Sequence, residues 1–156
     1  MWLKESHDFD MKRIFFLLVF FCIFLIAGAQ IRKIPASVTD AFATLYPHAS
    51  HVEWKDKLEH FQAKFQLNGC TMTAAFSSKG EWEESERELN FEQLPNEVQN
   101  GFLKSKYAER RKTDACEIQQ LGKPLQYRIS VERSSIEKKI LYFDVNGKIV
   151  KESMAL

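Results

Sequence analysis

The fold is decided by residues 61–76, which read FQAKFQLNGCTMTAAF. Every second residue from Phe61 to Leu67 is apolar, a period of two that predicts a strand with one buried face. The dipeptide Asn68-Gly69 favours the positive φ angles of a two-residue turn. A second alternating run then returns from Cys70 to Phe76. The stretch therefore predicts an antiparallel hairpin with one side in a hydrophobic core.

The same plan occurs twice in the chain, and an internal repeat determines the architecture before any single residue is interpreted. Residues 34–42 (IPASVTDAF) recur as residues 94–102 (LPNEVQNGF), and residues 61–82 match residues 127–149. Each copy opens with a proline suited to the first turn of a helix. Apolar residues at helical spacing follow it. The repeated unit is therefore one helix followed by strands.

Four strands are expected in each copy. They lie around Val52 and Trp54, at 61–67, 70–76 and 81–88, and then at 115–118, 125–131, 141–145 and from Ile149 onward. Because Trp82 is the only large apolar residue of 81–88, we expect that strand at a sheet edge, where its charges discourage pairing with other chains.

The predicted fold class is α+β: two tandem α-β-β-β-β repeats that form a curved antiparallel sheet of about eight strands, with the helices on one face. The opposite face is then open to water. The spacing of the motifs does not decide whether the two four-stranded sheets join edge to edge. We place repeat 1 at residues 30–90 and repeat 2 at residues 91–156.

Residues 1–29 predict a secretory signal peptide. Lys12 and Arg13 precede an apolar run at residues 14–27, and small residues then suit cleavage after Ala29. The run is shorter than the roughly 18 to 20 residues that span a bilayer, so a membrane anchor is the weaker alternative. Met11 is the expected start, because the residues before it carry both charge signs. These features predict a periplasmic or secreted protein without a stable membrane anchor after cleavage.

The charge balance argues against nucleic acid as a partner, because the formal net charge is +1 and no basic run is present. Two cysteines remain after cleavage, Cys70 and Cys116. An exported protein can hold a disulfide. Their separation along the chain does not decide between one bridge and two free thiols, of which Cys70 would be a small core residue.

The helix followed by four strands, in tandem, together with the hairpin at residues 143–150 (FDVNGKIV), resembles the PepSY-like family related to the β-lactamase inhibitor protein fold. The resemblance covers residues 34–152. It implies an exported, non-catalytic protein whose open sheet face receives a partner, which for the inhibitor is a β-lactamase. Cys70 and Cys116 lie in different halves, so the inhibitor's bridge within each repeat cannot form. No inhibitory loop can be matched, and a fold does not fix a function.

No catalytic, metal or cofactor site emerges from the sequence. His48, His51 and His60 are close in sequence, but Pro47 places the first two in a loop, so we interpret them as surface residues and not as metal ligands. The glutamates of residues 81–88 lack the loop that arranges oxygen ligands around calcium. Ser37 and Ser134 have no histidine partner in register, and no glycine-rich phosphate loop is present. We therefore predict a protein that is not an enzyme.

The outward positions of the strands are the remaining candidates for a site. The predicted partner-binding residues on the open face are Tyr142, Arg128, Gln126, Lys64, Gln62, Glu53 and Glu83. We expect Tyr142 and Arg128 to be exposed and to contribute most, because rigid or forked side chains dominate interface energetics.

The sequence thus predicts an exported binding protein for a protein or peptide of the cell envelope, with inhibition of a protease or a β-lactamase as one form of that role. The alternative is an envelope sensory or structural adaptor protein that binds a small ligand. A face that is merely solvated is the plainer interpretation of the same positions, and an enzyme is the third class.

Overall fold

The computed structural model describes residues 33–134 and 136–154, so the predicted signal peptide and its cleavage site lie outside the described residues. Residues 34–156 form one compact unit. In chain order its elements are α2 (Ala36–Leu45), β1 (Ser50–Asp56), β2 (His60–Leu67), β3 (Cys70–Ser77), β4 (Trp82–Leu89), the 3-10 helix η1 (Phe91–Gln93), α3 (Asn96–Leu103), β5 (Arg111–Gln120), β6 (Gln126–Glu132), β7 (Lys138–Phe143) and β8 (Ile149–Met154). None of the described helices is both long enough and apolar enough to span a membrane.

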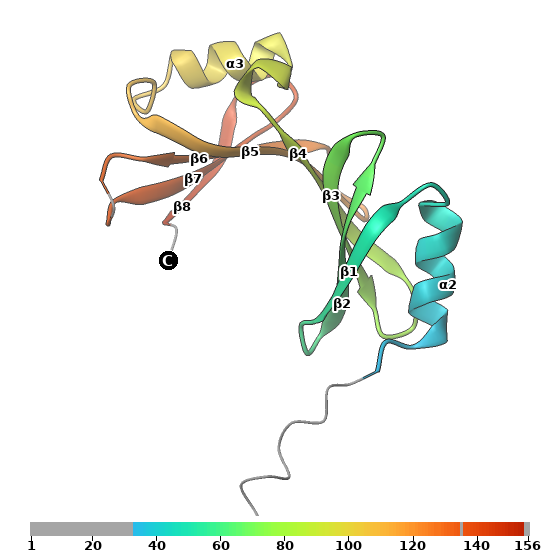
Figure 1. Ribbon diagram of the computed structural model, residues 1–156. Helices are drawn as coiled ribbons and strands as arrows, with labels where there is room; N and C mark the ends of the chain where they lie inside the picture. Colours follow the sequence, from blue (N-terminus) through green and yellow to red (C-terminus); the bar gives the residue numbers. More distant parts are fainter. Residues whose placement is uncertain (1–32, 135, 155–156) are drawn as a thin grey trace, which may run out of the picture. The chain divides into compact units, whose positions relative to one another are not determined.

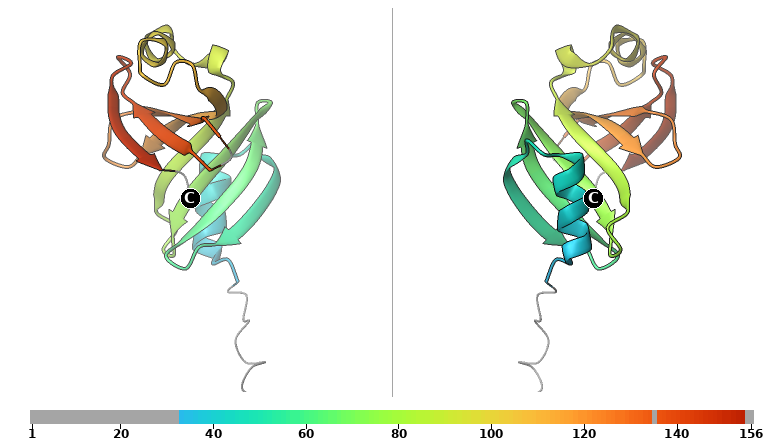
Figure 2. Two further views of the ribbon diagram at one scale, coloured as in Figure 1. Left: turned by 90° about the vertical axis from the view of Figure 1, so that its left-hand side faces the viewer. Right: turned by 90° about the vertical axis from the view of Figure 1, so that its right-hand side faces the viewer.

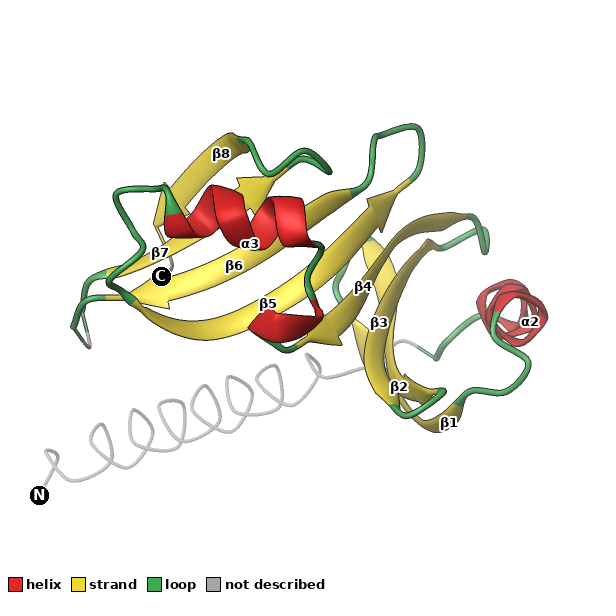
Figure 3. Ribbon diagram, turned by 90° about the horizontal axis from the view of Figure 1, so that it is seen from above, coloured by secondary structure: helices red, strands yellow, loops and turns green. Residues whose placement is uncertain are grey.

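The eight strands of the described residues form a single antiparallel sheet in the order of the chain, β1 to β8 (Figure 1). The helix α2 lies against one face of the first four strands (Figure 2), and α3 lies over β5 to β7 (Figure 3). The sheet is curved, with both helices on its outer side (Figure 1). The predicted α+β class with two tandem α-β-β-β-β repeats is confirmed, and the two sheets join edge to edge.

The predicted edge position of the fourth strand is wrong, because β4 lies inside the sheet. Six residue pairs join it to β5, from Glu84 opposite Gln120 to Leu89 opposite Ala115. The strand carries few apolar residues because it lies between two separate hydrophobic clusters, one under each helix. The true edges of the described sheet are β1 and β8.

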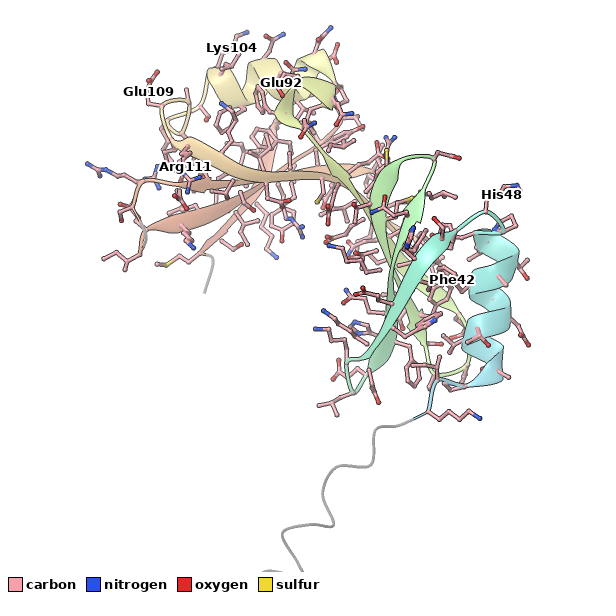
Figure 4. The ribbon with its side chains drawn as sticks, viewed as in Figure 1. Phe42, His48, Glu92, Lys104, Glu109 and Arg111 are labelled. Atoms are coloured by element: carbon pink, nitrogen blue, oxygen red, sulfur yellow. The ribbon has the colours of Figure 1, made fainter. Side chains whose placement is uncertain are left out.

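The core of the first repeat forms under α2. Val38 and Phe42, four residues apart on one side of the helix, are buried against apolar residues of β2 and β3. The Phe42 side chain points from the helix toward the sheet (Figure 4), and its ring centre lies 5.0 Å from that of Phe65 and 5.3 Å from that of Trp54. This aromatic packing fixes α2 on the helix-covered face.

The core of the second repeat has the same construction. Val98 and Phe102 of α3 occupy the positions that match Val38 and Phe42, and they are buried with Ile129, Leu141 and Phe143. The sequence repeat between residues 34–42 and 94–102 therefore corresponds to a repeated packing arrangement.

The turn glycines Gly80 and Gly147 also hold equivalent places. Both have positive φ angles, of 87° and 78°. A Cβ atom on Gly80 would overlap the Ser37 main-chain carbonyl, and one on Gly147 would overlap the Glu97 carbonyl, each in the first turn of a helix. In both repeats the last hairpin turn therefore packs directly on the start of the helix, which only glycine allows.

Two positions of the predicted strands are exposed for local reasons. Val52 of β1 is 37% exposed, and a bulge between Ser50 and Glu53, with His51 at a φ of 52°, interrupts the strand there. Val145, the last residue of the strand expected at 141–145, lies in the turn before β8 and is exposed.

We predict that Gly147→Ala destabilises the protein more than Gly122→Ala. Both glycines have positive φ angles, which cost an alanine about 1 to 2 kcal/mol. A Cβ atom on Gly147 would overlap the Glu97 main-chain carbonyl, whereas a Cβ atom on Gly122 meets no atom within 4 Å. Overpacking of this kind costs about 1 to 3 kcal/mol, so the free energy of unfolding in urea should fall by about 2 kcal/mol more for Gly147→Ala. Equal losses would contradict the close contact.

Candidate functional site

The candidate site is the face of the sheet opposite α2 and α3, called the open face below. Cross-strand pairing places two rows of side chains on it. One row is Glu53, Lys64, Thr73, Glu86, Ile118 and Gln126, and the other is Glu88, Cys116, Arg128, Tyr142 and Lys151. Within the described residues, no helix lies against this face (Figures 1 and 3).

Six of the seven predicted site residues lie on the open face. Arg128 and Tyr142 are direct cross-strand neighbours, and Gln126 is two residues before Arg128 on β6. Lys64, Gln62 and Glu53 lie on β1 and β2, at the other end of the sheet. The structure thus divides the predicted residues into two groups on a common face.

Glu83 is the exception. A bulge between β3 and β4 pairs Phe76 with Trp82 and Ala75 with Glu84, which leaves Glu83 between them. Its main-chain carbonyl accepts a hydrogen bond from the Leu121 N–H. The extra residue shifts the alternation of β4, so that Glu84, Glu86 and Glu88 face the open side in its place.

Arg128 is not the exposed guanidinium that the sequence predicted, because its side chain is only 23% exposed. It reaches across β5 and donates two hydrogen bonds to Glu86 of β4, Nη1 to Oε1 at 2.6 Å and Nη2 to Oε2 at 2.9 Å. Asp114 accepts a third, longer contact at 3.4 Å. This bidentate geometry is the strong form of an arginine–carboxylate pair, and it ties the second repeat to the first.

The pKa of Arg128 is raised, which keeps its guanidinium charged. Burial alone lowers the Arg128 pKa, but the facing Cys116 sulfur and the Glu86 carboxylate outweigh burial. The Arg128 guanidinium therefore stays charged in the folded protein, and Arg128 supports the face more than it reaches out from it.

Cys116 lies beside this pair, directly opposite Arg128 on β5, and is 1% exposed. Burial raises its pKa from the usual 9.0 to about 12, although the Arg128 charge acts in the opposite direction. The thiol is therefore protonated and unreactive at neutral pH. Cys70 and Cys116 are both free thiols.

The glutamates of β4 are the site residues that sequence reasoning missed. Glu88 accepts a hydrogen bond from Lys64 Nζ at 3.0 Å, Glu86 pairs with Arg128, and Glu84 accepts one from Gln120. The glutamate-rich run at residues 81–88 was visible in the sequence. Its partners were not, because they come from β2, β5 and β6.

A hollow of about 440 Å³ opens on this face next to the Arg128–Glu86 pair. It is lined by Glu84, Glu86, Ile118, Gln120, Lys123, Gln126, Tyr142, Val150 and Lys151. The Lys151 ammonium lies 5.2 Å from the centre of the Tyr142 ring. Both charge signs, an aromatic ring and buried Ile118 suit a partner side chain with polar and apolar parts. Among the described residues, no group of three or more His, Cys, Asp or Glu side chains could hold a metal ion.

A family model described as "Putative beta-lactamase-inhibitor-like, PepSY-like" matches residues 59–151. The chain belongs to this PepSY-like family. The match confirms the resemblance inferred from the repeated helix and strands. A search of curated proteins gave no match for this PepSY-like chain.

Solved structures share the fold of the PepSY-like chain. A BLIP-like protein from Bacteroides fragilis is 26% identical, with a TM-score of 0.76 over 81% of this chain and 89% of its own. A DUF2874 family protein from Bacteroides ovatus is 23% identical, with a TM-score of 0.75 over 79% of this chain and 89% of its own. A protein described as periplasmic from Bacteroides eggerthii is 21% identical, with a TM-score of 0.74 over 79% of this chain and 90% of its own.

We predict that Arg128 and Glu86 are energetically coupled. A double-mutant cycle of Arg128→Met and Glu86→Gln should give a coupling of about 1 to 2 kcal/mol in the free energy of unfolding, because the pair is bidentate and largely shielded from water. The matched cycle of Lys64→Met and Glu88→Gln should give less than about 0.5 kcal/mol, because those side chains are half exposed. Similar small couplings in both cycles would show that the Arg128 pair does not bind the repeats together.

The raised pKa of Cys116 predicts a loss of stability in alkali. Below about pH 9 the Cys116 thiol is protonated in the folded and in the unfolded protein, so its burial does not make stability depend on pH. Between about pH 9 and 12 the unfolded chain releases this proton and the folded chain retains it, so the free energy of unfolding falls as pH rises. The fall should be steeper than in Cys116→Ala, as measured by urea denaturation at each pH. Parallel curves would contradict a buried thiol.

Proposed function

We propose that the protein is an exported, non-catalytic binding protein that receives a protein or peptide partner on its open face. The observation that carries this proposal is a sheet face without a covering helix in the described residues, with Tyr142 at the rim of a hollow. Family membership supports a binding role, as does the description of the Bacteroides fragilis relative as BLIP-like. The description of the Bacteroides eggerthii structure as periplasmic supports the location.

In this proposal Tyr142 and Gln126 contact the partner, and Arg128 positions them. Tyr142 is half-buried, so its ring is held in place before a partner arrives and loses little freedom on binding. Arg128 is already bound to Glu86 and Asp114, so its role is to hold β6 against the first repeat. Lys64, Gln62 and Glu53 would form the polar rim, where individual contacts contribute little.

The non-catalytic part of the proposal is supported by the chemistry of the face. Its β4 carboxylates, Glu84, Glu86 and Glu88, are each paired with a cation or an amide. Its thiol, Cys116, is protonated and buried. These groups stabilise the sheet and do not form a nucleophile with a base.

A small ligand is a second candidate occupant, which the hollow beside Tyr142 favours. Its volume of about 440 Å³ lies in the range of small-molecule sites. A thermal-shift screen would reveal such a ligand by a rise in melting temperature. The same ligand should then lose its effect in Tyr142→Ala.

We predict that a photo-crosslinking residue at position 142 captures a discrete protein partner in the periplasm, whereas the same residue at Lys104, directly after α3, does not. Both positions are accessible, but strand pairing places Tyr142 on the open face, whereas Lys104 follows α3 on the helix-covered side (Figure 4). With the partner identified, Tyr142→Ala should weaken its binding by about 30-fold or more, the equivalent of about 2 kcal/mol for an interface anchor. Equal capture at Lys104, or unchanged affinity in Tyr142→Ala, would refute the proposed interface.

A further inference from the structure

A second hollow, away from the Tyr142 hollow, lies where the turn after α3 meets the ends of β5 and β6. Its volume is about 460 Å³, and it is lined by Lys106, Glu109, Arg110, Arg111, Glu132 and Arg133. Four of these six side chains are cationic. The proposed function of the open face makes no use of this cluster.

Arg110 is the central residue of this hollow, and its side chain is only 17% exposed. Its guanidinium lies 5.0 Å from the centre of the Tyr107 ring. The Tyr107 hydroxyl donates to Glu152 Oε2 at 2.6 Å, which anchors the ring. The Arg110 guanidinium is therefore held in one place by stacking, as a ligand-binding arginine needs to be.

The hydrogen bonds of Arg110 are incomplete. Its Nη2 donates to Glu137 Oε1 at 2.7 Å. Its Nη1 is buried and has no hydrogen-bond partner within the described part of the chain. A buried donor without an acceptor costs free energy, and an acceptor placed beside it recovers that cost. The structure thus contains an unfilled donor on a side chain that lines the hollow.

The other cations of the hollow are only loosely held. The Arg133 Nη1 atom lies 3.9 Å from Oε2 of Glu137, the carboxylate that Arg110 also contacts. The Lys106 Nζ atom lies 3.6 Å from Glu152 Oε1. Both side chains are more than 70% exposed, so these pairs contribute little stability and can rearrange.

Glutamates lie in and beside the hollow. Glu132 is paired with Arg111. Glu109 projects from the turn after α3 away from Arg111 (Figure 4). The lining residues alone carry four cations against two glutamates, but Glu137 and Glu152 beside the hollow pair with Arg110, Arg133 and Lys106 and offset this excess. An anion that enters would draw Lys106 and Arg133 from these long, exposed pairs, and Arg110, a lining residue, carries the unfilled donor.

We propose that this hollow binds a small oxyanion, a phosphate or carboxylate group, with the Arg110 Nη1 donating a hydrogen bond to it. Arg133 and Lys106 turn toward the anion and neutralise its charge. The planar guanidinium fork matches the oxygen spacing of both groups. This proposal is independent of the open face and stands or fails separately from the partner-binding function.

The test is a titration of the ¹⁵N-labelled protein by NMR with inorganic phosphate and, separately, with succinate, at ionic strength held constant with chloride. The Arg110 side-chain signals and the amides of residues 106–111 and 132–133 should shift and saturate. Saturation with phosphate alone assigns a phosphate site, and saturation with succinate alone assigns a carboxylate site. Non-saturating shifts spread over all the lysines and arginines would overturn the proposal.

Variants distinguish a specific anion site from non-specific attraction between the anion and surface cations. Arg133→Gln should weaken anion binding at least about fivefold, because it removes one charged hydrogen bond from an exposed side chain without disturbing the core. The matched control is Lys104→Gln, which removes an equal charge outside the lining. Equal weakening in both variants would overturn the proposal. Arg110→Lys, which keeps the charge and loses the fork, should abolish saturation, and its amide spectrum reports whether it is folded.

Discussion

The pairing of β4 with β5 is the interaction on which the rest of the structure depends. It converts two small helix-and-sheet units, each with its own core, into one sheet of eight strands. Side chains reinforce the junction on both faces. On the helix-covered face Arg87 donates a hydrogen bond to Glu117 at 3.0 Å, and on the open face Arg128 donates two hydrogen bonds to Glu86. The junction is thus polar on both sides, although the cores that flank it are apolar.

This junction determines what the open face can do. Each repeat brings one helix to the same side of the sheet, so duplication leaves the opposite side uncovered in the described residues. The β4 carboxylates on that side are paired with Lys64, Arg128 and Gln120. Self-paired charges make the face rigid and limit non-specific attraction. A partner would then be recognised through the shape of the hollow and the ring of Tyr142.

The sequence predicted the features that depend on local patterns. Period-two runs and the turn Asn68-Gly69 identified the hairpins, and that turn has the expected positive φ angles of 51° and 77°. The matched segments at residues 34–42 and 94–102 identified the two helices and their buried faces.

The features that the sequence did not predict depend on distant parts of the chain. A strand with one large apolar residue resembles an edge strand, and only its pairing with β5 shows that β4 is internal. Glu86 and Arg128 are 42 residues apart, so no local pattern could pair them. A single bulge reversed the alternation of β4 and exchanged Glu83 for Glu84 on the open face. The orphaned donor of Arg110 likewise has no signature in the sequence.

The most direct test of this account is native-state hydrogen exchange of the amides of β4 and β5. If the sheet is continuous, these amides should exchange as slowly as those of β2, β3, β6 and β7 and far more slowly than the outer amides of β1 and β8. Exchange of β4 and β5 at the rate of the edge strands would mean that the repeats open independently, and the single open face would not exist as a stable surface.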